Sequence, residues 1–350
     1  MSAAPRAVPP VPPRPTLESV AAEAGVSRGT ASRALNGGTN VSPKALQAVL
    51  DAADRLGYRP NLAARSLVLG RSGSIGLLVS ESDDRLFNDP FFAKVVRGAH
   101  RELADHGMQL VLSLSQTPEE RAQTVRFAAG RHLDGVLLIS VRGGDPLPEA
   151  LLEAGIPVVM AGRESRARTD RGLWWVDADN RGGARAAVEH LIEGGRRCVV
   201  TVAGPADMAV GRDRAAGWRD ALRAAEGEPP SADRLERGEF TIESGWECTH
   251  RLLRRYPDLD AVFAASDLMA MGALQALREA GRRVPDDVAL VGFEDIPAAE
   301  QTDPPLTTVR QPVEAIGRQM AALMIARLAG EGIRPPWSVL PTELVVRQSG

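Results

Sequence analysis

Apolar residues near the N-terminus recur with the spacing of a helix. One face of a first predicted helix is formed by Leu17, Val20, Ala21 and Ala24, which fall at i, i+3, i+4 and i+7. Thr16 can cap the start of this helix, and Gly25 breaks the pattern as a tight turn requires. Ser27 can cap a second helix, whose small apolar face is Ala31, Ala34 and Leu35. Two short helices around a glycine-containing turn predict a helix-turn-helix motif.

A third helical pattern follows the loop at Gly37-Gly38. Ser42 and Pro43 are typical of the N-cap and the first residue of a helix. The predicted apolar face is Leu46, Val49, Leu50 and Ala53, and Gly57 ends the pattern. Residues 16–60 are therefore predicted to form a small all-α domain. Residues 1–15 contain six prolines and no apolar period, so they are predicted to be a disordered arm.

The pattern changes at residue 74, where short β-branched or leucine-rich runs begin to alternate with helical periodicity. Buried strands are predicted over Ile75–Val79, Leu110–Leu114, Val136–Ile139, Val158–Met160, Trp174–Val176, Val199–Val202, Ala261–Ala264 and Val288–Val291. Helices are predicted over Phe92–His106, Pro118–Ala129, Leu147–Ala154, Asn180–Glu193, Arg214–Ala225, Glu243–Arg255 and Asp267–Ala280. This alternation predicts an α/β domain with doubly wound parallel sheets. Two such series predict two lobes, with a ligand between them at the carboxyl ends of the strands.

Composition narrows the class of protein. Apolar residues make up 44% of the 350 residues and aromatic residues only 4%, so the predicted core is built on Ala, Val and Leu. No run approaches the roughly 20 apolar residues of a membrane span, and the N-terminus has no apolar signal segment. We therefore expect a cytoplasmic protein with no membrane partner. Cys198 and Cys248 form no C-x-x-C pattern and are predicted to be buried free thiols.

The net charge of −3 conceals an asymmetry along the chain. Residues 1–71 hold nine Arg or Lys and four Asp or Glu, a net charge of +5, while the remainder carries −8. A basic N-terminal segment on an acidic body suits a DNA-binding module attached to a domain that does not touch DNA. Charge alone is equally compatible with a solvated surface, and it is the helix-turn-helix motif that favours DNA binding.

The stretch from Thr16 to Leu67 resembles the DNA-binding end of the LacI/GalR (lactose-repressor-like) family of bacterial transcription regulators. The resemblance continues without a gap through Val41-Ser42-Pro43 and Leu56-Gly57-Tyr58-Arg59-Pro60-Asn61. It implies that residues 61–73 are a hinge helix and linker, and that Leu67 wedges into a minor-groove base step. A helix this short is marginal in water, so a plain linker is the alternative.

A competing motif lies in the same stretch. Gly25-Val26-Ser27-Arg28-Gly29 fits G-x-S-x-G, the nucleophile elbow of hydrolases. That elbow requires a preceding strand, whereas an amphipathic helix is predicted here. The sequence therefore favours the helix-turn-helix over the hydrolase elbow.

Residues 74–347 resemble the effector domain of the same family, which is similar to periplasmic sugar-binding proteins. Matching runs include Asp89-Pro90-Phe91-Phe92, Asp134-Gly135-Val136, Ser266-Asp267-Leu268-Met269-Ala270 and Gly292-Phe293-Glu294-Asp295. The resemblance implies a first lobe of about 74–176 and 307–333, a second lobe of about 177–304 and 336–347, and three crossings. Helix Val313–Leu328 is expected in the first lobe and strand Leu340–Val346 in the second. The sequence ends at Gly350 without a heptad tail, so we expect a homodimer.

Candidate DNA contacts cluster at the start of the second helix. Arg28, Gly29 and Arg33 are the candidates for reading bases, because arginine can form two hydrogen bonds with guanine. Gly29 departs from the family, in which a side chain usually reads a base at this position. Phosphate contacts are expected from Ser27, Thr30, Asn36 and Asn61, with a capping or surface role as the alternative for each. The candidates in the hinge are Ala64 and Leu67.

Candidate ligand contacts come from the resemblance of the effector domain. It nominates Asp89, Phe91, Arg163, Arg214, Phe240, Asp267 and Glu294. Carboxylates and guanidinium groups beside an aromatic ring suit a sugar, whose hydroxyls take hydrogen bonds and whose CH face packs on the ring. Phe91 has a core alternative, and Asp267 is favoured as the N-cap of the helix that it opens. Glu294 stands where an aspartate is common, so its reach into the cleft can differ.

No pattern typical of a catalytic, metal or cofactor site is present, since the five histidines are dispersed and no P-loop or dinucleotide fingerprint occurs. The sequence therefore predicts a dimeric regulator that binds a palindromic operator in double-stranded DNA. It is expected to repress carbohydrate genes until a mono- or disaccharide releases it. The alternatives are a regulator co-repressed by a non-sugar metabolite, a solute-binding protein, and an α/β enzyme. A transport protein has no use for residues 16–60, and an enzyme needs a poised base or nucleophile.

Overall fold

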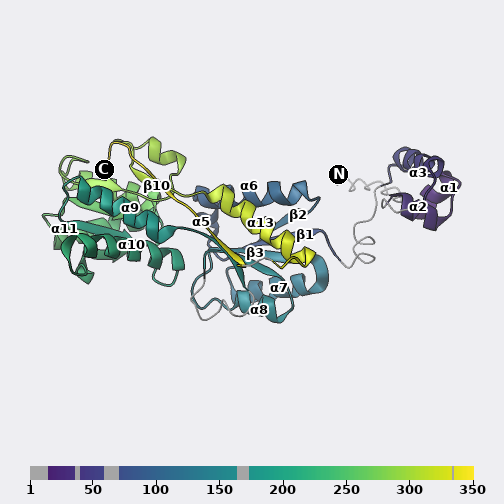
Figure 1. Cartoon of the computed structure of the whole chain (residues 1–350), viewed down its shortest axis with the longest axis horizontal. Coiled ribbons are helices and arrows are strands. Elements are labelled where there is room, and N and C mark those ends of the chain that lie inside the picture. The colour runs from purple at the N-terminus through teal and green to yellow at the C-terminus, as the bar shows by residue number, and fades with distance from the viewer. Residues whose placement is uncertain (1–14, 36–39, 59–70, 164–172, 333–334) are drawn as a thin grey trace, which may run out of the picture. The chain divides into compact units, whose positions relative to one another are not determined.

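The computed structural model describes residues 15–35, 40–58, 71–163, 173–332 and 335–350. The chain divides into two compact units, residues 1–72 and residues 73–350 (Figure 1), each with its own hydrophobic core. The fold is the predicted one, a small all-α helix-turn-helix domain and a two-lobed α/β domain with parallel sheets. In the described ranges, no helix is long and apolar enough to cross a lipid bilayer.

The described residues of the first unit form three helices packed together. Its helices are α1 (Leu17–Glu23), α2 (Arg28–Leu35) and α3 (Pro43–Leu56). The hydroxyl of Thr16 accepts the backbone N–H of Ser19 and caps α1, and Gly25, with a φ of +66°, makes the turn into α2. One residue from each helix is fully buried where the three helices meet: Val20, Ala31 and Val49. The predicted helix-turn-helix is confirmed.

The buried face of α3 differs from the predicted one. Val49, Ala52 and Ala53 are buried, whereas Leu46 and Leu50 are 38% and 42% exposed. The two alanines lie on the inner side of α3 because their short side chains let it approach the other helices closely. The helical period then places the two leucines at the edge of the apolar stripe.

The first lobe of the second unit is built on a parallel sheet. Its described strands form a six-stranded sheet in the order β11-β5-β4-β3-β1-β2. They are β1 (Ser74–Val79), β2 (Gln109–Leu114), β3 (Gly135–Ile139), β4 (Val158–Ala161), β5 (Trp174–Ala178) and β11 (Trp337–Leu340). The described helices of this lobe are α5 (Asp83–Asn88), α6 (Pro90–Asp105), α7 (Pro118–Phe127), the π-helical turn η1 (Ala128–His132), α8 (Leu147–Glu153) and α13 (Val313–Ala329).

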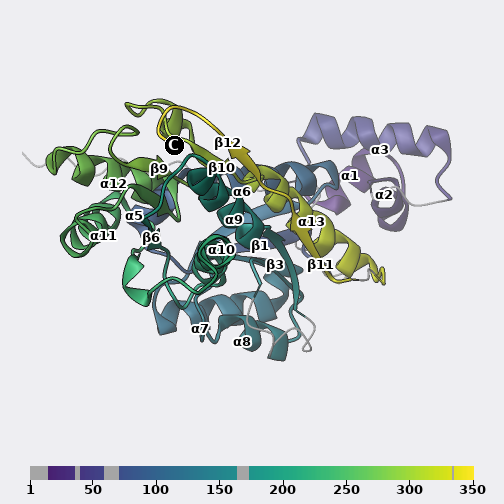
Figure 2. The same ribbon diagram turned by 60° about the vertical axis from the view of Figure 1, so that its left-hand side comes forward.

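Alternate residues of the first-lobe strands face opposite layers of helices. Leu77 packs with the layer of α6 and α13, and Leu78 packs with that of α7 and α8. This period of two is typical of a sheet buried on both faces. Helix α13 lies along α6 in both ribbon views (Figures 1 and 2). The close approach requires Gly98, where a Cβ would lie 2.0 Å from the carbonyl oxygen of Glu314.

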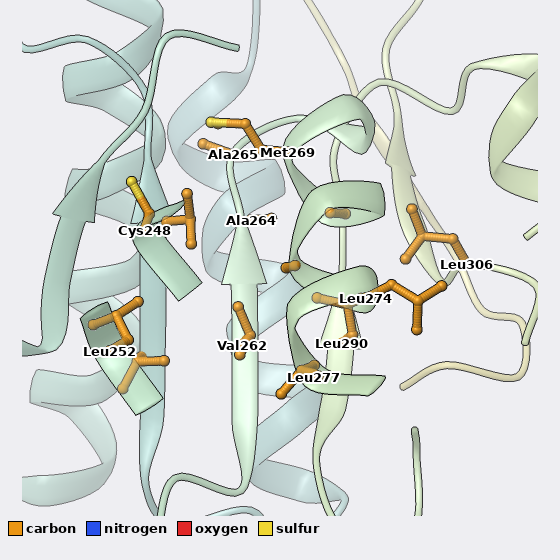
Figure 3. Close-up of a cluster of buried hydrophobic side chains, with 14 of the residues drawn as sticks. Cys248, Leu252, Val262, Ala264, Ala265, Met269, Leu274, Leu277, Leu290 and Leu306 are labelled. Carbon is orange, nitrogen blue, oxygen red and sulfur yellow. The ribbon is translucent and has the colours of Figure 1, made fainter. Parts of the chain in front are cut away.

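The second lobe repeats this plan with a smaller sheet, whose described strands run in the order β7-β6-β8-β9. They are β6 (Val199–Ala203), β7 (Leu235–Arg237), β8 (Ala261–Ala264) and β9 (Ala289–Val291). The described helices are α9 (Asn180–Glu193), α10 (Ala209–Glu226), η3 (Ala232–Arg234), α11 (Ile242–Arg255), α12 (Asp267–Glu279) and η4 (Pro297–Glu300). Val262 of β8 packs with Leu252 and Leu277 on the side of α11 and α12 (Figure 3). Its neighbour Phe263 packs with Trp218 on the side of α9 and α10.

Within the described residues, the chain passes between the lobes three times: after β5, after β10 (Thr308–Arg310) and after β11. Strand β10 pairs antiparallel with β12 (Glu343–Val345) in a separate small sheet. The backbone N–H of Asp179 donates to the carbonyl of Leu340 at 2.8 Å, which joins the first crossing to the third. The first and third crossings therefore lie side by side and are hydrogen-bonded to each other, so they are not independent linkers.

The structure corrects the predicted lobe boundaries at two places. The strand expected over Leu340–Val346 is β12, but residues 337–340, also expected in the second lobe, form the additional strand β11, which pairs in parallel with β5 of the first lobe. Residues 307–310, expected in the first lobe, instead lie with the second, where Val309 is buried in the core. Strands of three or four residues are too short to carry a readable period, so their partners are set by tertiary contacts.

Other predicted elements agree with the structure to within a few residues, and α9 has the expected bounds. Helix α5 and strands β7 and β10 are additional. The strand β2, predicted to be buried, lies at the edge of its sheet, where Leu112 is 46% exposed. Both cysteines are free, and Cys248 is buried as predicted, whereas Cys198 is only half-buried.

Candidate ligand-binding cavity and DNA-binding helix

The start of α2 presents the candidate DNA contacts to solvent. The Ser27 hydroxyl accepts the backbone N–H of Thr30 at 3.1 Å and so caps the helix. Arg28, Gly29 and Arg33 are exposed. Arg28 pairs with Glu18 through Nε and Oε1 at 2.7 Å, but both side chains are well exposed. Such a surface pair contributes roughly 0–1 kcal/mol, so a nucleic acid can displace it.

The remaining candidates of the DNA-binding site lie outside the described residues. They are Asn36, Asn61, Ala64 and Leu67. The hydrolase alternative is excluded by the local structure, because Gly25–Gly29 leads from α1 into the first turn of α2, so the element directly before it is a helix and not a strand.

A cavity of about 240 Å³ lies between the two lobes of the second unit. This volume is somewhat below the roughly 300–1,000 Å³ typical of small-molecule sites. Its wall is formed where strands of both sheets end, as expected for parallel sheets. Six of the seven nominated residues line it: Asp89, Phe91, Arg163, Arg214, Phe240 and Glu294.

Arg214, on α10, is the buried centre of the cavity floor and is only 1% exposed. Its Nε donates to the side-chain oxygen of Asn180 at 2.9 Å, and its Nη2 donates to that of Gln311 at 3.1 Å. Its Nη1 donates to the carbonyl of Ala265 at 2.6 Å and to Oε1 of Glu294 at 3.3 Å. Asn180 follows the first crossing and Gln311 follows β10 at the second, so Arg214 ties two crossings to the second lobe.

Glu294 brings a carboxyl group to the cavity wall with one oxygen unpartnered. Its Oε2 is buried and has no hydrogen-bond partner among the described residues. Burial, followed by the nearby charge of Asp89, raises the pKa of Glu294 to about 8, despite the contact with Arg214. Burial also raises the pKa of Asp89, which caps α6 by accepting the backbone N–H of Phe91 at 2.9 Å. The cavity therefore offers carboxyl groups with free hydrogen-bonding capacity.

Phe240 provides the aromatic surface of the cavity. It adopts a left-handed backbone with a φ of +60°, which is rare for a side chain of this size. Its ring lies against Gly204, where a Cβ would be 2.3 Å from the ring Cζ. Two other residues of the wall, Ser140 and Glu294, also have positive φ values, of 58° and 111°. Such backbone strain concentrates at binding sites, where surrounding contacts hold it in place.

Two sets of ion pairs join the lobes at the cavity. Arg142 of the first lobe contacts Asp207 at 3.2 Å and Glu239 at 2.7 Å, both in the second lobe. Arg163 of the first lobe contacts Asp213 of α10, with Nη2 and Nε at 2.7 and 3.1 Å from Oδ2. These pairs need both lobes close together, so they favour the closed arrangement of the cleft.

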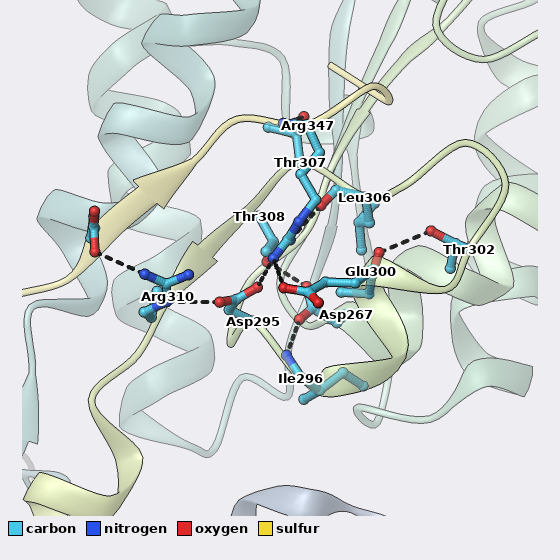
Figure 4. A network of polar contacts seen from close by, with 12 residues as sticks. Asp267, Asp295, Ile296, Glu300, Thr302, Leu306, Thr307, Thr308, Arg310 and Arg347 are labelled. Carbon is cyan, nitrogen blue, oxygen red and sulfur yellow. Dashed lines mark hydrogen bonds and ion pairs between the residues drawn. The ribbon is translucent and has the colours of Figure 1, made fainter.

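Asp267 does not line the cavity, and it is not the N-cap of α12. Ser266 is the N-cap, and Asp267 is the first helical residue. Its carboxylate is fully buried and accepts the backbone N–H of Ile296 and the hydroxyl of Thr308 (Figure 4). Burial raises its pKa to about 7. Asp267 therefore holds β10 and the segment after β9 to α12, which is a structural role.

Comparison with known proteins now identifies the family. Residues 16–61 match the model of bacterial regulatory proteins of the lacI family, and residues 188–350 match that of the periplasmic binding protein-like domain. The HTH-type transcriptional regulator CelR of Thermobifida fusca is 48% identical over 337 residues, 96% of this chain and 98% of that protein. The chain belongs to the lacI family of bacterial transcription regulators.

Other members of the lacI family are similar over nearly the whole chain. The ribose operon repressor of Halalkalibacterium halodurans is 32% identical, with 95% of this chain and 96% of that protein covered. Among solved structures, a transcriptional regulator CelR–cellobiose complex is 46% identical, with a TM-score of 0.76 and 96% and 100% coverage. A lac repressor dimer bound to operator and the anti-inducer ONPF is 26% identical, with a TM-score of 0.84 and 96% and 99% coverage. This lacI-family chain is thus a DNA-binding transcription regulator.

Several residues of the cavity wall were not nominated from the sequence. They include Arg85, Ser140, Arg142, Asp177, Asn180, Asp207 and Gln311. Asp177 is the penultimate residue of β5, and Ser140 follows β3, so the general rule that ligands bind at the carboxyl ends of parallel strands could have found them. Burial raises the pKa of Asp177 to about 6. In the described part of the chain, no cluster of His, Cys, Asp and Glu is suited to hold a metal ion.

Proposed function

We propose that this lacI-family regulator is a cytoplasmic repressor that binds a palindromic operator as a homodimer and is released by a neutral sugar, a disaccharide such as cellobiose. It acts by binding and performs no catalysis. The observation that carries the proposal is the cavity between the lobes, with carboxyl and guanidinium groups around the ring of Phe240. The relative solved with cellobiose, at 46% identity, supports the same class of ligand.

The DNA-binding part of the proposal assigns base contacts to Arg28 and Arg33. Ser27 and Thr30 lie at the capped start of α2, where backbone and hydroxyl groups suit phosphate oxygens. One helix-turn-helix reads a half-site, so two-fold symmetry of a dimer calls for a palindrome. The proposal includes phosphate contacts from Asn36 and Asn61 and minor-groove contacts from Ala64 and Leu67.

The effector part assigns sugar binding to Asp89, Phe91, Arg163, Phe240 and Glu294, with Arg214 fixing the floor. Both lobes supply contacts, so a sugar binds the closed form better and shifts the population toward it. Closure then withdraws the hinge segments from the operator. The coupling is reciprocal, and sugar and operator weaken each other's binding by the same factor, typically ~5–150-fold.

A mobility-shift titration tests DNA binding. The expected result is tighter binding to a palindrome than to scrambled DNA of equal length, with affinity falling steeply as salt rises. Arg33→Ala should weaken operator binding, whereas Arg185→Ala should not, because Arg185 pairs with Glu189 within α9. Equal affinity for palindromic and scrambled DNA would contradict the proposal.

A sugar panel added to the operator complex tests the switch. We expect cellobiose or a related disaccharide to release the DNA. Leu67→Ala should weaken operator binding while leaving sugar affinity unchanged. A ligand that strengthens operator binding would instead assign the chain to the co-repressed class, and a panel in which no sugar binds would reject the sugar effector.

A further inference from the structure

Arg85 lies in the cavity wall, but neither the sequence pattern nor the family resemblance nominates it. It belongs to α5, and its side chain is only 13% exposed. Its Nη1 contacts the carboxylate of Glu81, which also accepts the hydroxyl of Ser140 at 2.6 Å. Glu81 is itself buried. One end of the Arg85 guanidinium is therefore held by a buried acceptor, and its charge is balanced there.

Two aromatic rings lie against the same guanidinium group. The guanidinium carbon of Arg85 lies 5.2 Å from the ring centroid of Phe240 and 5.8 Å from that of Phe92. Phe240 belongs to the second lobe and Phe92 to the first, so Arg85 contacts both sides of the cleft. A cation over a ring face is attracted by the ring quadrupole. The side chain is therefore held in one orientation when the lobes are closed.

The opposite edge of the guanidinium has no partner. Nε is buried without a hydrogen bond, and Nη2 also donates to none of the described residues. These two N–H groups lie on one edge of a planar fork and point in nearly the same direction, which suits a pair of neighbouring oxygens. Beside it, Asp89 uses Oδ1 for the backbone N–H of Phe91, while Oδ2 has no partner among the described residues.

We propose that the Nε and Nη2 edge of Arg85 binds two adjacent hydroxyl oxygens of the sugar, and that Arg85 thereby determines which sugar is accepted. Asp89 Oδ2 accepts a hydrogen bond from one of these hydroxyls. A neutral diol fits better than a carboxylate, because Glu81 already balances the charge of Arg85 and Asp89 lies beside it in the wall. This inference rests on the proposed function, since it concerns the same cavity.

Calorimetry with cellobiose and its singly deoxygenated analogues tests the contact. In the wild type, removal of either of two adjacent hydroxyls should weaken binding roughly 10- to 100-fold, as expected for hydrogen bonds to a charged donor. Arg85→Lys keeps the positive charge that pairs with Glu81 but lacks the fork. This variant should bind cellobiose more weakly and show no further loss with those two analogues.

Arg212→Lys is the matched control, because Arg212 also lines the cavity and donates to the backbone carbonyl of Ala206. It should keep the wild-type penalty at both hydroxyls. Thermal unfolding without sugar establishes that both variants are folded, and a misfolded Arg85→Lys is replaced by Arg85→Gln in the same test. If the wild type binds cellobiose and Arg85→Lys or Arg85→Gln keeps the two penalties, this inference is overturned while the proposed function stands. If the wild type binds no sugar, both this inference and the sugar effector of the proposed function are rejected, while operator binding is tested separately by the mobility shift.

Discussion

The two lobes share a plan but present different polar groups to the cavity. The second lobe supplies Arg214, which is fully buried and bonded to Asn180, Ala265, Glu294 and Gln311. The first lobe supplies Arg85 and Asp89, each of which keeps polar atoms without a described partner. A bonded floor contributes mainly to the fold, whereas unpartnered groups are available to a ligand. The fully bonded residues therefore hold the cleft together, whereas the residues with unpartnered atoms are the ones that can bind a ligand.

The largest effect on stability is expected from replacing Arg214, on the floor of the cavity. Arg214→Leu leaves the carboxyl of Glu294 and the side chains of Asn180 and Gln311 buried without their partner, so the free energy of unfolding should fall by about 3–5 kcal/mol. Urea unfolding measures it. Arg212→Leu is the control on the same helix, since Arg212 is exposed and, among the described residues, bonds to a backbone carbonyl. Similar losses in the two variants would show that the floor is not a structural centre.

The common plan of the lobes can be tested with two glycines. A Cβ would lie 2.0 Å from a backbone oxygen at Gly98, between α6 and α13, and also at Gly272, between α12 and α11. Replacement of either by alanine forces the helices apart and should cost about 1–3 kcal/mol of stability. Gly332→Ala, where a Cβ meets nothing within 4 Å, should have little effect. If only one of the buried substitutions destabilises, the lobes differ in how tightly their helices pack.

The pH dependence of stability reports on Glu294. Its pKa is raised from 4.5 to about 8 by burial and by Asp89, so the folded state favours the protonated carboxyl. Its contribution to the free energy of unfolding is fully present below pH 4.5 and is lost as pH rises to about 8. The slope is at most about 1.4 kcal/mol per pH unit. Glu294→Gln should remove this component, and titrating groups that do not interact with Glu294 cancel in the difference. Parallel stability curves for the two proteins would contradict the assignment.

The smallest effect, a change in sugar affinity, is expected from the exposed ion pairs that join the two lobes. Arg142→Ala removes the contacts with Asp207 and Glu239, worth roughly 0.2–1 kcal/mol, so sugar affinity should fall by up to about fivefold. The loss should shrink at high salt, which screens such pairs. Arg185→Ala, within α9, is the control and should leave affinity unchanged. A loss that does not depend on salt would mean that Arg142 contacts the sugar directly.

Sequence patterns predict this molecule best where a local period reports on burial. The helices α1, α2 and α9 and most strands follow from such periods, and the family resemblance places Asp89, Phe240 and Glu294 in the cavity wall. Neither the sequence periods nor the family resemblance predicts Arg85 as a cavity residue. Its helix, α5, has six residues, opens with Asp83 and Asp84 and has the pattern of a surface segment. Its role depends on Phe240, which lies far away in the sequence.

Asp267 is the converse case, a residue whose local sequence predicts roles that its long-range contacts replace. Its position at the start of α12 predicts an N-cap, and its family motif predicts a ligand contact, yet its oxygens are used by Ile296 and Thr308. Both partners lie at least 29 residues away along the chain. Contacts of this range follow from how the lobes fold together, which local periodicity does not describe.

The separation of a bonded floor from an unpartnered wall bears on how such regulators diverge after gene duplication. A substitution in the first-lobe wall changes the hydrogen bonds offered to the ligand without disturbing Arg214 or the crossings that it ties together. Most mutations destabilise, and a lineage persists only while its stability stays above the threshold for function. A substitution that alters only the unpartnered atoms of the wall, and keeps the contacts of Arg85 with Glu81 and of Asp89 with α6, leaves that stability margin intact, whereas one at the floor consumes it.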